Sequence, residues 1–165
     1  MSSSVSKAFT SEDAPPEVLV RPRRVLAPGE KRYVTPQGER ALRQALERLQ
    51  EERAATADPG RRAALEVQAQ GLSDTLADLT VVAPDPAQAG RAFFGAWVTL
   101  AGADGEELRY RLVGPDEIDA AAGLISVDSP LARALLGREK GDEVVVDRPR
   151  GRVEFSLLRV EYPID

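Results

Sequence analysis

Two short apolar stripes separated by a tight break constrain this chain more than any other feature. The first stripe consists of Leu42, Leu46 and Leu49, and the second consists of Leu65, Ala69, Leu72, Leu76 and Leu79. Spacings of three and four residues place each stripe on one narrow face of a helix. Asp58, Pro59 and Gly60 stand in the break. Because each narrow face can be buried only against the other, the sequence predicts an antiparallel helical hairpin, a short coiled coil.

The start of the first helix is marked by two residues. Thr35 can accept hydrogen bonds from the unpaired amides of a first helical turn, and the fixed φ of Pro36 suits the next position. The helix is therefore expected to begin at Pro36. With about 20 residues on each side, the hairpin would be an arm about 30 Å long. The alternative is that both helices pack on the rest of the chain, but such narrow stripes favour a projecting arm.

Beyond residue 90 the apolar period changes from helical to alternating. Residues 92–100 and 107–113 are rich in β-branched and aromatic side chains, and Asp104 and Gly105 between them are typical of a hairpin turn. In the second of these strands, Arg109 and Arg111 alternate with apolar residues. The pattern predicts an antiparallel sheet with both arginines on the solvent face.

A short helix and two further strands follow. Ser129 and Pro130 can cap and open a helix over residues 131–136, whose leucines would cover the sheet before Gly137 ends it. The leucines are Leu131, Leu135 and Leu136. The next strands are expected at residues 143–148 and 153–162. The second of them changes phase between Leu157 and Leu158, which predicts a β-bulge.

The predicted fold class is α+β, with the arm followed by a sheet domain that carries a short helix. Prolines and glycines separate the parts. The expected divisions are a disordered leader at 1–32, the arm at 33–82, a linker at 83–90 and the sheet domain at 91–165.

Composition narrows the function. The 165 residues include no Cys and no His, which removes disulfides, thiolate nucleophiles, imidazole bases and the usual zinc ligands. The net charge is −5, and neither folded part has the basic excess that autonomous nucleic-acid binding needs. No run is long and apolar enough for a membrane helix. Any metal would have to be a hard ion such as magnesium, held by Asp or Glu oxygens. We expect a cytoplasmic protein that acts by docking on another protein, with no cofactor of its own, no membrane contact and no active site.

Several segments resemble one family closely. They are YVTPQGERALRQALERL, GRAFFGAWVTL, DGEELRYRLVGPDEI, LISVDSPLARALLG, GDEVVV and a closing VEY. In this order they are similar to the Gre transcript elongation and cleavage factors, and the sheet domain is most similar to the GreB branch. The resemblance implies an FKBP-like C-terminal domain that binds the rim of the secondary channel of bacterial RNA polymerase, while the arm enters the channel. Nucleic acid would then be contacted only through the transcription complex.

The family's docking loop precedes the short helix, so the resemblance assigns partner binding to Asp128, Ser129 and Pro130. Asp128 is the strongest of the three candidates, because a cap and a helix-opening proline explain the other two.

The tip of the arm departs from the family. Gre cleavage factors carry an acidic motif there that helps to hold a magnesium ion in the polymerase active site. Here Asp58 is the sole carboxylate in the turn, close to Arg61 and Arg62, and Mg²⁺ usually wants one or two well-placed carboxylates. Asp58 is therefore a weak catalytic candidate, and we expect no efficient stimulation of cleavage.

Two alternatives remain. In one, the chain does stimulate cleavage, with Asp58 or Glu51 and Glu52 sharing a magnesium ion with the polymerase active site. In the other, the FKBP-like domain is a prolyl isomerase with an aromatic pocket, although strand patterns place most of its aromatic residues in the core. These residues are Phe93, Phe94, Trp97, Tyr110, Phe155 and Tyr162.

Overall fold

The computed structural model describes residues 26–163. Residues 1–25 of the predicted disordered leader, which spans 1–32, lie outside the described residues. The elements of the arm and its base are β1 (Arg32–Val34), α1 (Pro36–Ala55), α2 (Pro59–Asp78) and β2 (Leu79–Val81). The later elements are η1 (Pro86–Gln88), β3 (Trp97–Gly102), β4 (Glu107–Val113), β5 (Leu124–Ser126), α3 (Pro130–Leu135), β6 (Glu143–Arg148) and β7 (Gly151–Glu161).

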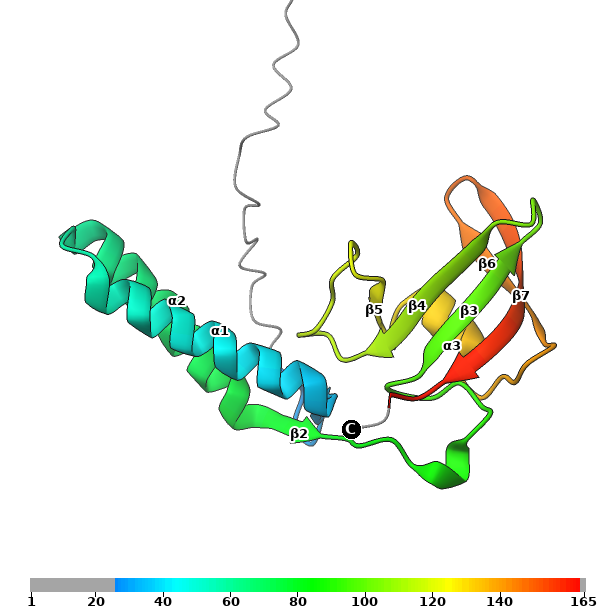
Figure 1. Cartoon of the computed structure of the whole chain (residues 1–165), viewed down its shortest axis with the longest axis horizontal. Coiled ribbons are helices and arrows are strands. Elements are labelled where there is room, and N and C mark those ends of the chain that lie inside the picture. Colours follow the sequence, from blue (N-terminus) through cyan, green and yellow to red (C-terminus); the bar gives the residue numbers. More distant parts are fainter. Residues whose placement is uncertain (1–25, 164–165) are drawn as a thin grey trace, which may run out of the picture.

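The two long helices lie side by side and run in opposite directions, as the stripes predict (Figure 1). α1 begins at Pro36, and the amide of Gly38 donates to Thr35 Oγ1 over 3.0 Å. α2 begins at Pro59, after Asp58. Both helix starts therefore follow from an oxygen-bearing cap residue and a proline at the first helical position.

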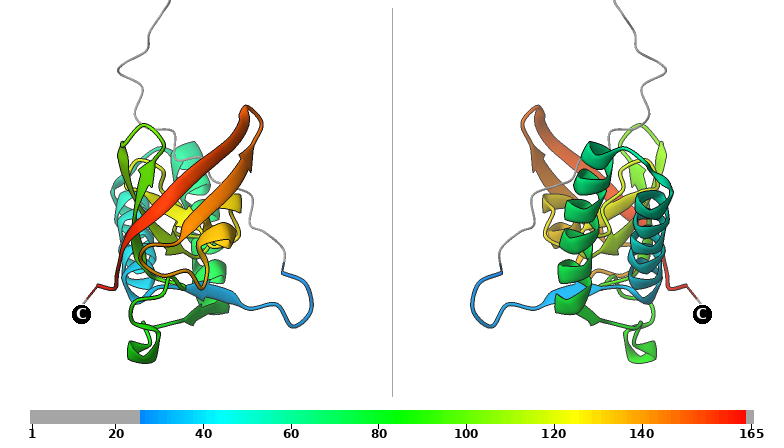
Figure 2. Two further views of the ribbon diagram at one scale, coloured as in Figure 1. Left: turned by 90° about the vertical axis from the view of Figure 1, so that its right-hand side faces the viewer. Right: turned by 90° about the vertical axis from the view of Figure 1, so that its left-hand side faces the viewer.

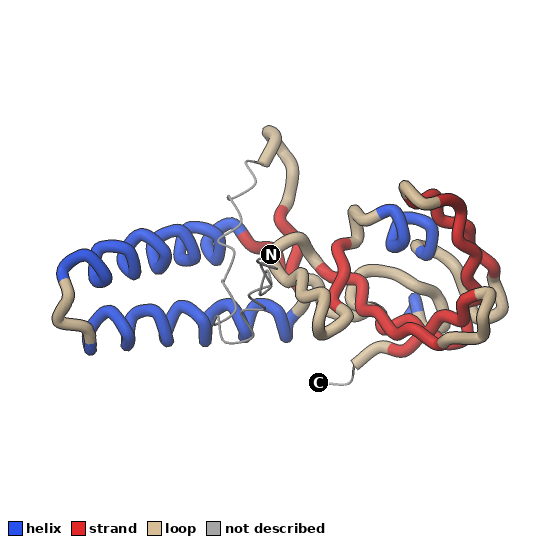
Figure 3. Tube along the Cα trace, turned by 90° about the horizontal axis from the view of Figure 1, so that it is seen from above, coloured by secondary structure: helices blue, strands red, loops and turns tan. Residues whose placement is uncertain are grey.

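The contact between the helices is narrow. α2 buries Leu65, Ala69 and Thr75, whereas no residue of α1 is fully buried. The hairpin projects away from the sheet domain, and only its base adjoins that domain (Figures 1 and 3). The arm is therefore confirmed, and the alternative in which both helices pack on the rest of the chain is wrong. Among residues 26–163, no helix is long and apolar enough to cross a membrane.

A two-stranded parallel sheet, formed by β1 and β2, joins the two ends of the arm at its base. Arg32 pairs with Leu79 and Val34 with Val81, and Val34 is completely buried. Leu79, expected as the last residue of the second stripe, lies in β2 instead. Its backbone is engaged by β1, and α2 therefore ends at Asp78.

The C-terminal domain is built on a five-stranded sheet in the order β5-β4-β3-β7-β6. The sheet is strongly curled (Figure 2). β3, β4, β6 and β7 pair in the antiparallel manner that the sequence predicts. β5 was not expected, and it pairs with β4 in parallel. The turn between β3 and β4 contains Asp104 and Gly105, and Gly105 has φ of 80°, a left-handed value that glycine adopts without strain.

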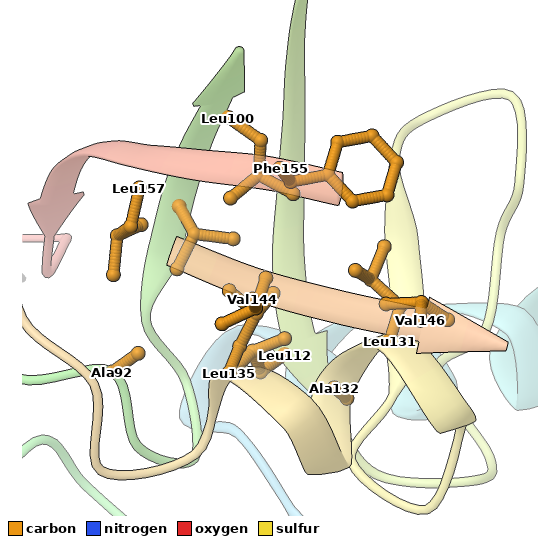
Figure 4. Packing of buried hydrophobic residues seen from close by; sticks show 11 residues of the cluster. Ala92, Leu100, Leu112, Leu131, Ala132, Leu135, Val144, Val146, Phe155 and Leu157 are labelled. Carbon is orange, nitrogen blue, oxygen red and sulfur yellow. The ribbon is translucent and has the colours of Figure 1, made fainter. Parts of the chain in front are cut away.

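The predicted bulge is confirmed. Thr99 pairs with Arg159 and Leu100 with Leu157, so Leu158 is the extra residue of β7. Before this step Phe155 and Leu157 lie in the core (Figure 4), and beyond it Val160 packs against the same cluster. The buried core cluster contains Ala92, Val98, Leu100, Leu112, Leu131, Ala132, Leu135, Val144, Val146, Phe155 and Leu157.

Three local expectations were wrong. The first strand begins at Trp97 rather than at residue 92, because Gly95, with φ of 86°, turns the chain before the strand. Arg111 is only 6% exposed, because the base of the arm covers it. Leu136 is 39% exposed, because α3 ends at Leu135 and Ala132 takes the third inward position.

Candidate docking loop and arm tip

The loop between β5 and α3, residues 127–130, is held by backbone hydrogen bonds. We call it the docking loop. The amide of Val127 donates to the carbonyl of Val113 on β4 over 2.9 Å. The amide of Ser129 donates to the carbonyl of Ser126 over 2.9 Å, and that of Asp128 to Ser126 Oγ over 3.1 Å. Each residue from 127 to 129 thus has its amide paired, which fixes the course of the loop.

The docking loop passes directly into α3. Ser129 Oγ accepts from the amide of Ala132 over 3.2 Å, and Pro130 occupies the first turn of the helix. The helix rests on the core through Leu131, Ala132 and Leu135 (Figure 4). Ser129 and Pro130 therefore have structural roles of their own. Asp128 is exposed and is not the capping residue, so its carboxylate is the group in this loop that helix formation does not require.

Two surface hollows flank the docking loop. The larger, of about 300 Å³, is lined mainly by apolar side chains; it includes Ser129, Pro130 and Leu131 together with Tyr110, Ile125, Val146, Asp147, Arg148 and Pro149. The smaller, of about 200 Å³, has Val127 and Asp128 in its wall, together with Leu26, Glu30, Lys31, Arg32, Tyr33, Gly114 and Pro115. The loop is thus a fixed ridge with a carboxylate between two recesses.

At the other end of the molecule, Asp58 caps α2. Its Oδ1 accepts from the amide of Gly60 over 3.2 Å. Arg62 donates from Nη2 to the carbonyl of Thr56 over 2.8 Å, which closes the turn between the helices. The carboxylate predicted as a weak catalytic candidate therefore has a structural role in the tip.

Two other carboxylates near the tip form ion pairs across the hairpin. Glu52 on α1 pairs with Arg61 on α2, and Glu66 on α2 pairs with Arg53 on α1 over 3.5 Å. The hydrogen bond to Glu52 and its negative charge raise the pKa of Arg61 above its usual value. Glu51 is exposed on α1 beside Glu52. Within residues 26–163, no three acidic side chains are grouped so that they could hold a metal ion.

The aromatic residues do not gather into one pocket. Of the six aromatic side chains considered for a prolyl-isomerase site, only Tyr110 lines the larger hollow, and Phe155 is buried in the core. The remaining four line neither hollow.

One group of polar residues that the sequence does not indicate lies where the arm meets the sheet domain. Glu117, Arg111 and Asp116 contact residues near the start of α1. Their partners are 74 to 84 residues away in the chain, so no local pattern could have indicated them.

Comparison with known proteins places the C-terminal domain. Residues 87–162 match the family model "Transcription elongation factor, GreA/GreB, C-term". The chain is 51% identical over 92 residues to the transcription elongation factor GreB of Pseudomonas aeruginosa, which covers 56% of this chain and 55% of that protein. It is 45% identical over 103 residues to GreA of Nitratidesulfovibrio vulgaris strain Miyazaki F, covering 62% and 64%. The chain thus spans little more than half the length of the GreB relatives that it matches.

Two solved structures of bacterial factors are among those to which the chain is similar. The GreA factor homolog 1 (Gfh1) protein of Thermus thermophilus is 24% identical with a TM-score of 0.40, covering 80% of this chain and 99% of that one. A GreA/GreB elongation factor from Nitrosomonas europaea is 25% identical with a TM-score of 0.43, covering 81% and 99%. The matches to residues 87–162 and to the curated relatives show that this chain carries a C-terminal domain of the GreA/GreB family of transcription elongation factors.

Proposed function

We propose that this chain is a Gre-type factor that binds bacterial RNA polymerase at its secondary channel and regulates elongation without efficient stimulation of transcript cleavage. The observation that carries the proposal is a contrast between the two ends of one molecule. The GreA/GreB match includes the docking loop, whereas Asp58 at the arm tip caps α2 and the nearby Glu52 and Glu66 form ion pairs.

The docking loop suits recognition of a protein surface. Its backbone is already ordered by internal hydrogen bonds, so little conformational entropy is lost when a partner binds. Asp128 supplies a charge, and the apolar hollow beside Pro130 can receive an apolar side chain. A charged group can orient the partner, and an apolar recess beside it can bury an apolar side chain of that partner. Protein interfaces combine both kinds of contact.

The arm tip is poorly suited to magnesium. Mg²⁺ sheds its waters reluctantly and is usually held by one or two carboxylates with near-ideal geometry. Asp58 accepts an amide at the start of α2, and Glu52 is paired with Arg61. Placing a second cation here would break one of these contacts and add repulsion from Arg61 and Arg62. The chain would therefore act by occupying the channel, with no catalytic group or cofactor of its own.

A direct test measures binding and cleavage on one sample. Core polymerase from bacteria is incubated with the full chain, co-purified, and supplied with backtracked complexes and Mg²⁺. We expect co-purification without release of short 3′ RNA fragments, while a GreB factor on the same complexes provides the positive control. Fragment release that depends on Glu51, Glu52 or Asp58 would support the cleavage-stimulating alternative instead.

The docking loop is tested by matched variants in the same pull-down. Asp128→Ala should weaken co-purification, whereas Glu154→Ala, which removes another exposed carboxylate from β7, should not. Equal retention of both variants would show that the docking loop does not carry the binding. A proline-peptide turnover assay on the same preparation should give no activity above that of the buffer.

A further inference from the structure

The base of the arm meets the sheet domain at a cluster of polar residues, which we call the joint. The joint brings together the segment Thr35 to Gly38 at the start of α1 and residues 111–117 at the end of β4. Thr35 is only 1% exposed and Glu117 is half-buried, so the contact is largely shielded from water. Buried polar groups require partners of the right geometry, and the joint therefore specifies one relative position for its two sides.

Glu117 is the centre of the joint. Its Oε2 accepts from the amide of Thr35 over 3.0 Å and from the amide of Gly114 over 2.9 Å. Its Oε1 is hydrogen-bonded to Thr35 Oγ1. One carboxylate thus binds a residue at the arm base and a residue of the sheet domain at the same time.

Two glycines allow this close approach. A Cβ on Gly38 would lie 1.8 Å from Glu117 Oε1, so any side chain there would displace the carboxylate. A Cβ on Gly114 would lie 2.0 Å from the carbonyl oxygen of Tyr33, so a side chain there would push β1 away. The contacts of the joint can therefore form only because both positions are glycine.

Two arginines make further contacts at the joint. Arg111 donates from Nη2 to Gln37 Oε1 over 2.9 Å and from Nε to the carbonyl of Gly95 over 3.1 Å. Arg32 forms an ion pair with Asp116 over 3.4 Å. Arg111 and Arg32 are both buried. The contacts at the joint explain why Arg111 of β4 is buried, although its position in the strand pattern predicts that it faces solvent.

We infer that Glu117 is a positioning residue that holds the arm at one angle to the docking loop. Residues 114 and 115 line the same hollow as Asp128, so the joint and the docking loop share a wall. An arm of 20 residues is about 30 Å long, so a rotation of about 20° at its base moves the tip by about 10 Å. Loss of the joint would thus misplace the tip while the docking loop stays intact. This consequence for polymerase rests on the proposed function; the orientation itself does not.

The orientation can be measured on the free, full chain by the distance between spin labels. The chain contains no cysteine, so introduced cysteines are labelled uniquely. One pair, Ala57→Cys and Ala103→Cys, spans from the arm tip to the hairpin between β3 and β4. A second pair, Ala103→Cys and Lys140→Cys, lies within the sheet domain and reports whether that domain is intact.

We expect one narrow tip-to-hairpin distance in the otherwise unchanged chain. Glu117→Ala should broaden it and shift it by about 10 Å while the second pair keeps its distance. Glu117→Gln should restore the narrow distance, because an amide can accept from both backbone amides with its oxygen and donate to Thr35 Oγ1. An unchanged tip distance in Glu117→Ala, or equal broadening of both pairs, would overturn the inference.

The glycines provide an independent test with a matched control. Gly38→Ala should broaden the tip distance, although alanine is the better helix former. Gly71→Ala in α2 has open space around the added methyl group, and it should leave the distance unchanged. Equal behaviour of the two variants would contradict the role of the joint.

Binding and elongation assays with polymerase then distinguish a failure of this inference from a failure of the proposed function. Glu117→Ala should co-purify with polymerase as well as the unchanged chain does but should lose the effect on elongation. If the unchanged chain fails to bind, the proposed function is wrong and the label distances still decide the inference. If Glu117→Ala moves the tip but keeps the full effect on elongation, positioning of the arm by Glu117 has no part in that effect.

Discussion

The arm tip and the docking loop each precede a helix that begins in the same way, but they differ in the role of their carboxylate. In both, a residue with a side-chain oxygen caps a helix that opens with proline: Asp58 before Pro59, and Ser129 before Pro130. At the tip the capping oxygen belongs to the carboxylate itself. In the docking loop a serine provides it, and Asp128 stands one residue earlier. A carboxylate that caps a helix has a structural role that metal binding would disturb, whereas the cap of α3 is Ser129 and not Asp128.

The two ends also differ in what supports them. α3 rests on a buried core, but the tip is held by hydrogen bonds and ion pairs between exposed residues. Exposed ion pairs contribute little to stability, whereas buried side chains contribute much more. The docking loop is thus the more rigidly supported of the two, which agrees with a role in recognition.

The largest expected effect tests this difference in support. Leu135→Ala removes a completely buried side chain beneath the docking loop, and we expect a loss of about 3 kcal/mol in the free energy of unfolding. The adjacent Leu136→Ala, at an exposed position, should cost less than about 1 kcal/mol. Denaturant unfolding measures both. Equal losses would show that α3 does not depend on the core in the way described.

The next effect separates recognition from capping within the docking loop. Asp128→Ala should reduce polymerase affinity about 30-fold, close to 2 kcal/mol, a value typical of an interface hot spot. It should change stability little. Ser129→Ala removes the cap, so it should lower the free energy of unfolding by about 1 kcal/mol. Titration with polymerase and denaturant unfolding of both variants would expose any reversal of these roles.

Features determined by neighbouring residues could be predicted from the sequence. The start of α1 follows from Thr35 and Pro36, and the bulge at Leu158 follows from a phase change within one strand. The cap at Ser129 was also recognisable. In each case the residues that cause the structure lie within a few positions of each other, so a short pattern contains all the information.

Features that depend on distant partners could not be predicted. β1 and β2 have three residues each, too few to show an alternating pattern, and they pair across the whole arm. Arg111 fits the solvent side of its strand by pattern, and only its contact with Gln37 explains its burial. Of the candidate site, the docking loop was found through its resemblance to a family. Glu117 was missed, because its partner Thr35 is 82 residues away.

A smaller effect compares two variants at the tip. Asp58→Ala removes the cap of α2 and should cost about 1 kcal/mol of stability. Asp58→Asn keeps an oxygen that can cap but loses the charge, so its stability should stay close to that of the unchanged chain. Neither variant should alter RNA fragment release from backtracked complexes. Fragment release by the unchanged chain that both variants abolish would mean that the charge of Asp58 serves a metal ion and that the two ends are chemically alike after all.

The smallest effect concerns titration, because the arm tip and the sheet domain each contain a group with a raised pKa. Arg61 at the tip stays protonated at any accessible pH, so its raised pKa has no effect on pH dependence. Partial burial raises the pKa of Tyr162 in the sheet domain above its usual 10.0, against the opposing effect of the hydrogen bond from the Phe93 amide. Its hydroxyl donates to the carbonyl of Arg91.

Since the folded state keeps this proton at a pH where the unfolded chain has lost it, the free energy of unfolding should fall as pH rises above 10.0. Tyr162→Phe has no such proton. It should cost about 1 kcal/mol at neutral pH for its lost hydrogen bonds. Above pH 10 the difference between the two proteins should shrink, and denaturant unfolding at several pH values measures it. A difference that stays constant or grows would mean that the phenol is as well solvated as the exposed residues of the tip.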